Sequence, residues 1–213
     1  MSMISIRILG FAGLVAAILM FIGDIGLHGY LGSGRDFEAN LSLIVSKRPE
    51  PQIVAGGFIG PIASLLYCLG FLSIYGMISP KSPVLAAIAT GSAAGSIIIG
   101  GAYHAMWGIR GLLIKAGLPS SSYQALYDRI VKYTRLFYNA MMVFAGVASL
   151  VLLFVVLSGR SLYPRWTAVV NPGLLLLFKP LARFIPSPLG AIVSGGYLNL
   201  VFVVFFSVML IVT

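Results

Sequence analysis

Three ionisable side chains, Asp24, His28 and His104, lie within long apolar stretches of the chain. An ionisable group at membrane depth is expensive to insert, so such residues are candidates for function. Asp24 and His28 are four residues apart, which places them on one face of a helix. A buried carboxylate keeps its charge only beside such a partner and otherwise takes up a proton. These residues suggest general acid or base chemistry at Asp24, tuned by His28, with His104 orienting or sharing the proton.

A second set of polar and aromatic side chains falls in the same half of the apolar stretches, toward the loops rich in Lys and Arg. Aromatic residues with polar tips suit the wall of a pocket for an amphipathic molecule. The asparagines suit such a wall and suit a structural bridge between helices equally well. The candidate ligand-binding residues are Tyr103, Trp107, Arg110, Tyr138, Asn139, Asn171, Tyr197 and Asn199.

These residues leave several functions open. The first is an intramembrane site that binds, and in an enzyme would transform, an amphipathic lipid or isoprenoid-like molecule. The second is a haem protein, because two histidines on different helices at similar depth are what bis-histidine ligation requires. The sequence does not decide whether the protein is an enzyme, and it names no cofactor.

Two further alternatives use the same side chains. Asp24, His28 and His104 together offer three metal ligands, as in a zinc hydrolase that keeps a fourth position for water. In a proton-coupled transporter, Asp24 would be the protonation site and a helix broken at Asn171 and Pro172 would line the path.

The composition places these side chains in a membrane protein. Of 213 residues, 59% are hydrophobic and only 9% are charged, whereas a soluble domain has about 25% charged residues. The net charge of +9 does not indicate a nucleic-acid partner, because the basic residues sit singly or in pairs at the ends of apolar stretches. The single cysteine, Cys68, excludes an intrachain disulfide.

A spanning helix needs about 20 mostly apolar residues. The chain therefore predicts an all-α transmembrane bundle that forms a single domain over residues 1–213. Six spans are expected, at about 8–31, 53–78, 84–113, 136–157, 164–185 and 189–212.

The span at 164–185 is interrupted by Asn171-Pro172-Gly173 and by Pro180. It is long enough to cross with kinks at both prolines. Five spans plus a half-helix or re-entrant segment is the alternative.

Six spans place both termini and the second and fourth loops on one side of the membrane. Ten of the 14 Lys and Arg residues then fall on the other side. Cytoplasmic loops carry an excess of Lys and Arg, so we expect a multi-pass protein of the cell (inner) membrane with loops one, three and five in the cytoplasm.

Apolar residues at helical spacing continue through 121–135, the segment before the fourth span. Lys and Arg fall between them, which is typical of an interfacial helix. Ser121 and Gln124 fit a capping box, and Asp128 and Lys132 form an i,i+4 pair.

Glycines recur beside Asp24, at positions 23, 26, 29 and 32, and Gly91 and Gly95 form a small-xxx-small pattern. In lipid such glycines let helices approach closely, so we expect tight packing at both places. No phosphate-binding fingerprint is present.

Several short motifs resemble those of small bacterial polytopic membrane proteins of an uncharacterised family. They are GD at 23–24, YPRW at 163–166, NPG at 171–173 and GGYLN at 195–199. The resemblance implies a shared helical bundle in which these positions recur, and it implies no activity.

Overall fold

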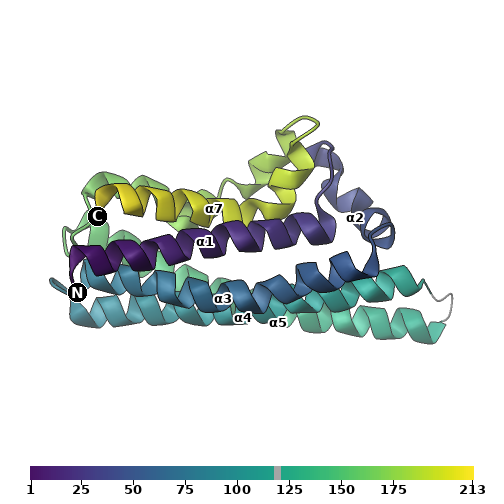
Figure 1. The fold of residues 1–213 in the computed structure, drawn as a ribbon, viewed down its shortest axis with the longest axis horizontal. Coiled ribbons are helices and arrows are strands. Elements are labelled where there is room, and N and C mark those ends of the chain that lie inside the picture. Colours follow the sequence, from purple (N-terminus) through teal and green to yellow (C-terminus); the bar gives the residue numbers. More distant parts are fainter. Residues whose placement is uncertain (118–120) are drawn as a thin grey trace.

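The computed structural model describes residues 1–117 and 121–213, and the side chains at 121 and 122 lie outside this description. Every regular element in the described part is helical, which confirms the predicted all-α fold. Five helices are long and apolar enough to cross a membrane (Figure 1). They are α1 (Met3–His28), α3 (Glu50–Ile78), α4 (Pro83–Ala116), α5 (Ser121–Leu157) and α7 (Gly190–Val212).

Local sequence signals set several helix ends. α1 begins after Ser2, whose hydroxyl oxygen accepts a hydrogen bond from the backbone nitrogen of Ser5 at 3.1 Å. Pro83 occupies the first helical turn of α4, where its missing N–H costs nothing. α4 ends at Gly117, whose φ of 55° is the left-handed conformation that favours glycine as a C-cap.

The long helices are neighbours in the order α7, α1, α3, α4, α5. Because α5 and α7 are the two ends of this arc, they are joined mainly through the segment between them in sequence. The buried apolar core draws on all five long helices, with Tyr67, Phe71 and Phe206 as its largest side chains.

The predicted span at 164–185 is a chain of short helices, which we call the broken crossing. Its elements are η2 (Arg165–Val170), α6 (Pro172–Leu176) and η3 (Lys179–Phe184). Pro172 and Pro180 each stand in the first turn of a new helix, because proline cannot continue the preceding one. The structure therefore has five long helices plus a broken segment, which is the predicted alternative to six spans, and no single helix covers 164–185.

The broken crossing nevertheless runs the length of the bundle. At its start the backbone nitrogen of Leu162 donates to the carbonyl of Met77, and at its finish Gly34 N–H donates to the carbonyl of Ile185. Both chain termini lie at one end of the bundle (Figure 1). We call this the terminal end, and we call the opposite end, with residues 29–50 and 178–190, the loop end.

Two elements at the loop end differ from expectation. The first loop holds η1 (Gly34–Asp36) and α2 (Phe37–Ser46), which the sequence did not predict. The segment 121–135 is continuous with the following span in α5, whose 37 residues extend for about 56 Å. The paired ends of α4 and α5 protrude beyond the other helices (Figure 1).

The predicted capping box depends on the side chain of Ser121, which lies outside the described residues. Gln124 Nε2 donates to Asp128 Oδ1 at 2.9 Å. No ion pair between Asp128 and Lys132 is found among the described residues.

The closest helix approaches occur at glycines. A Cβ added at Gly70 would lie 2.4 Å from the Cα of Gly13, where α1 crosses α3, and one at Gly57 would lie 2.9 Å from the Cα of Gly108, between α3 and α4. Of the glycines expected to pack tightly, Gly23 does contact α3, through Ile59. Gly91 does not, because a Cβ there would meet nothing within 4 Å.

Candidate functional site

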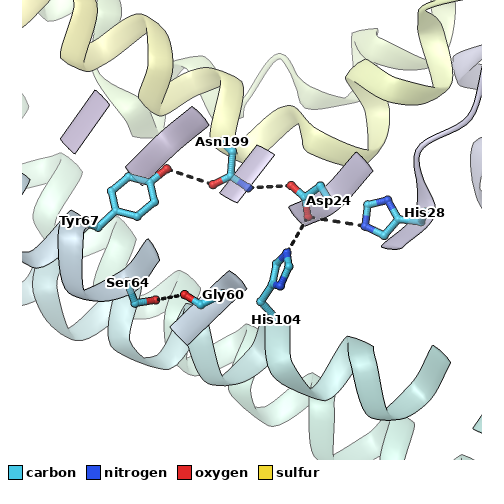
Figure 2. A network of polar contacts seen from close by, with 7 residues as sticks. All are labelled: Asp24, His28, Gly60, Ser64, Tyr67, His104 and Asn199. Carbon is cyan, nitrogen blue, oxygen red and sulfur yellow. Dashed lines mark hydrogen bonds and ion pairs between the residues drawn. The ribbon is translucent and has the colours of Figure 1, made fainter. Parts of the chain in front are cut away.

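The carboxylate of Asp24 lies at the centre of a buried polar network (Figure 2). His104 Nε2 is 3.2 Å from Asp24 Oδ1, and His28 Nε2 is 3.6 Å from the same oxygen. All three residues are nearly enclosed, at 8% exposure or less. The structure thus brings together the three residues that the sequence identified, from α1 and α4.

The other oxygen of the carboxylate is bound by α7. Asn199 Nδ2 donates to Asp24 Oδ2 at 2.7 Å, and Tyr67 Oη donates to Asn199 Oδ1 at 3.1 Å (Figure 2). Asn199 was a predicted site residue, whereas Tyr67 was not. The signal that could have identified Tyr67 is a phenol in the middle of the second span, far from either interface.

Glycines make room for the two imidazoles. A Cβ at Gly60 would lie 2.6 Å from His104 Cβ, and one at Gly195 would lie 2.9 Å from His28 Nδ1. The helices α3 and α7 therefore pack directly against the histidines. The Nδ1 atoms of both histidines are buried and have no hydrogen-bond partner in the described part of the chain.

The loop end covers this network. The rings of Phe37 and Trp107 lie edge-on to His28, at centroid distances of 5.5 and 5.9 Å. The last turn of α1 is capped from α3 and the residues before it, because Gln52 Nε2 donates to Gly26 O and the Arg48 guanidinium donates to Gly29 O. Cationic and polar donors at a helix C-terminus satisfy its free carbonyls and fix the position of His28.

Four predicted ligand-binding residues form one surface beside His28, on α4 and α5. The Arg110 guanidinium stacks over the Trp107 ring at 3.9 Å and lies 3.4 Å from Tyr127 Oη. Tyr103 contacts both Trp107 and Tyr138, with ring centroids 6.4 and 5.7 Å apart. We call Tyr103, Trp107, Arg110 and Tyr138 the aromatic face. Since Trp107 also touches His28, the aromatic face is continuous with the buried network.

The remaining predicted residues lie elsewhere. Asn171 begins α6, where its Oδ1 accepts from two backbone nitrogens and its Nδ2 donates to the carbonyl of Ser149. Tyr197 Oη donates to Leu175 O at 2.8 Å. Asn139 is exposed on the outside of α5. Asn171 and Tyr197 therefore hold the broken crossing in place, which is the structural bridging role.

The site does not fit a haem. Both histidine Nε2 atoms face one carboxylate oxygen. The helices α3 and α7 pack directly against the two imidazoles at Gly60 and Gly195. A porphyrin ring has no place between imidazoles arranged in this way. This arrangement does not favour the bis-histidine alternative.

A metal centre is not supported either. Among the described residues, no group of three His, Cys, Asp or Glu side chains is arranged to hold a metal ion. Asp24, His28 and His104 are close, but their nitrogen and oxygen atoms meet as partners in hydrogen bonding and charge. What the arrangement offers is a path for a proton between one carboxylate and two imidazoles.

Comparison with curated proteins and with solved structures finds no match for the chain. Comparison with protein-family models matches all of it, residues 1–213. The protein belongs to this matching family, which is described as a family of unknown function (DUF6796).

Proposed function

We propose that this protein is an integral membrane protein that binds an amphipathic lipid or isoprenoid-like molecule at an intramembrane acid–base site. Asp24 exchanges a proton, and His28 and His104 share it. The observation that carries the proposal is the meeting of two imidazole nitrogens at one buried carboxylate oxygen. A structural bridge needs only one such partner, and ionisable groups at membrane depth are functional by default.

The aromatic face supplies the contact with the ligand. Arg110 stacks on Trp107, the ring that contacts His28, and its Nε is buried without a partner among the described residues. An anionic or strongly polar headgroup suits this guanidinium. Trp107 then lies between the headgroup and His28, so that a shift of the indole ring opens the buried network to the ligand.

The distribution of Lys and Arg gives the orientation of the bundle in the membrane. The loop end holds ten of the 14 Lys and Arg residues, so it faces the cytoplasm of a cell by the positive-inside rule. The acid–base site then lies in the cytoplasmic half of the membrane.

The proton exchange is tested by infrared titration of the protein in lipid nanodiscs between about pH 4 and pH 9, a range that includes the ordinary pKa values of carboxyl and imidazole groups. We expect a carboxyl signal that titrates, that disappears in Asp24→Asn and that persists in Asp36→Asn, the matched control at the loop end. His104→Gln should move the titration. A spectrum in which Asp24→Asn removes no titrating band would refute the proton exchange.

Ligand binding is tested by mass spectrometry of lipids that co-purify with the protein. Arg110→Gln should lose a bound amphipathic molecule that the parent protein keeps. Arg129→Gln, which changes an exposed arginine of α5, should keep it. Equal lipid content in both variants would contradict the role of the aromatic face.

The broken crossing favours a second candidate, a proton-coupled transporter, because such proteins use interrupted helices near the substrate path. Its contacts weaken this candidate, since Asn171 binds α5 and does not reach Asp24. Proton uptake into liposomes that depends on an added solute and is lost in Asp24→Asn would favour transport over a lipid site.

A further inference from the structure

Two apolar cavities adjoin between the middle of the bundle and its terminal end. The larger lies among α3, α4, α5, α6 and α7, the smaller lies among α5, η2 and α7, and both are partly open to the outside of the bundle. Leu152 and Phe205 line both, so the two adjoin along α5 and α7, and we call them together the groove. From Val156 to Met141 this groove follows α5 for about 22 Å, which exceeds half of the hydrocarbon core of about 30 Å.

The groove is separate from the acid–base site. Its wall includes Phe71 and Phe202, whose rings pack against Tyr67, and none of Asp24, His28 and His104 lines it. The broken crossing forms its outer wall, since α5 and α7 are joined mainly through that segment. The lining is almost wholly apolar, which suits a hydrocarbon chain.

One polar group stands at the terminal end of the groove. Tyr163 lines the smaller cavity and is 5% exposed, and its hydroxyl has no hydrogen-bond partner among the described residues. Burial raises the pKa of the Tyr163 phenol, so the group remains a hydrogen-bond donor. A buried hydroxyl left without a partner is unfavourable, so an acceptor on a bound molecule would stabilise this arrangement.

Positive charge surrounds the same end. Lys81 Nζ donates to the carbonyl of Gly159 at 3.2 Å, the Arg165 side chain lies against Gly159, and Arg160 precedes Tyr163 by three residues. None of these cations forms an ion pair within the described part of the chain. The Asp and Glu residues lie elsewhere, in α1, η1, α2, α3 and α5 at or toward the loop end.

We propose that this groove binds one hydrocarbon chain of an anionic phospholipid, with its phosphate at Lys81, Arg160 and Arg165 and an ester carbonyl accepting from Tyr163. The charge at the mouth selects the anionic headgroup, and the apolar walls hold the chain. The residues proposed to bind the phosphate and the ester carbonyl lie at the terminal end, away from Asp24, so the proposal does not depend on the function proposed there.

The test uses the intrinsic fluorescence of Trp166, which is 53% exposed and follows Arg165. The chain has two tryptophans, so Trp107→Phe leaves Trp166 as the only reporter. This protein is placed in vesicles of phosphatidylcholine to which brominated phosphatidylglycerol or brominated phosphatidylcholine is added. We expect the anionic lipid to quench at a several-fold lower mole fraction. Equal quenching by the two lipids would overturn the proposal.

Substitutions at the mouth and in the wall of the groove test where the lipid headgroup and its hydrocarbon chain bind. Arg165→Gln should reduce the preference for the anionic lipid about fivefold, the effect of one basic residue near an anionic surface. Arg7→Gln, an exposed arginine of α1 near the same end, should leave it unchanged. Ala148→Phe, which fills the larger cavity, should remove the tight component of quenching, whereas Leu150→Phe on the exposed face should keep it.

Two further variants separate a loss of lipid binding from unfolding and from effects of the acid–base site. Tyr163→Phe preserves the ring and should weaken binding without unfolding the protein. Asp24→Asn should bind as the parent does, so failure of the acid–base proposal is distinguishable from failure here. An equal loss in Arg7→Gln and Arg165→Gln, or an unchanged signal in Ala148→Phe, would each overturn the proposed site.

Discussion

The two halves of the bundle hold their helices together in different ways. Near the loop end, α1, α4 and α7 meet at the carboxylate of Asp24, through His104 and Asn199. Near the terminal end, the contacts are aromatic rings and glycines, with Phe71 stacked on Phe206 and Gly70 against Gly13. Polar bonding specifies which groups meet, while apolar packing leaves room for a groove. This difference is the basis on which we propose acid–base chemistry in one half and lipid binding in the other.

The sharpest way to break this comparison is to remove the carboxylate. Asp24→Leu leaves His28, His104 and Asn199 without their shared acceptor, so we expect a loss of about 3–5 kcal/mol in the free energy of unfolding. Asn139→Leu, on the exposed face of α5, should change it by less than about 0.5 kcal/mol. Steric trapping in bicelles measures both. Similar losses for the two variants would mean that the network does not hold the loop half together.

The packing of the terminal half is tested at Gly70. Ala at this position places its Cβ 2.4 Å from the Gly13 Cα, a backbone contact that only a helix shift can relieve. We expect Gly70→Ala to cost about 1–3 kcal/mol. Gly91→Ala meets nothing within 4 Å and should be neutral or stabilise the helix by up to about 1 kcal/mol. If thermal unfolding in detergent ranks the two variants in reverse, the observed crossing of α1 and α3 is wrong.

The smallest effect is expected where the two halves meet. Tyr67→Phe removes one hydroxyl and its bond to Asn199, which should cost about 0.6–2 kcal/mol. In an Asn199→Leu background the same change should cost nothing further, because the acceptor is already absent. Tyr75→Phe, at a half-exposed tyrosine of the same helix, is the control. Additive losses in the double variant would show that Tyr67 acts independently of the network.

Much of the fold follows from hydropathy alone. The five long helices and the meeting of Asp24, His28 and His104 were predictable, because span length and the order of crossings set the depth of each residue. Rotation about a helix axis was not predictable at Asn139 or Gly91, which face away from the bundle. The sequence of a uniformly apolar helix does not indicate which face is buried, because apolar side chains suit both lipid and the protein interior.

Three other features were not fully predicted from the sequence, for different reasons. Tyr67 joins the network because its hydroxyl on α3 lies level with Asn199 on α7. That alignment depends on how the helices pack, which the sequence does not show. α2 was missed because a helix of ten residues is too short to register as a span. The break at Pro172 was visible in the sequence, but whether the pieces cross the bundle depended on contacts at both ends.

The broken crossing has a consequence for how the protein is made. A segment of short helices leaves backbone N–H and C=O groups unpaired, and lipid cannot satisfy them. Here some of them are satisfied by neighbours, as where Asn171 caps α6 and Tyr197 binds the carbonyl of Leu175. Residues 164–185 therefore cannot enter the bilayer as an independent unit during synthesis. We expect them to settle against α5 and α7, whose groups bind Asn171 and Leu175.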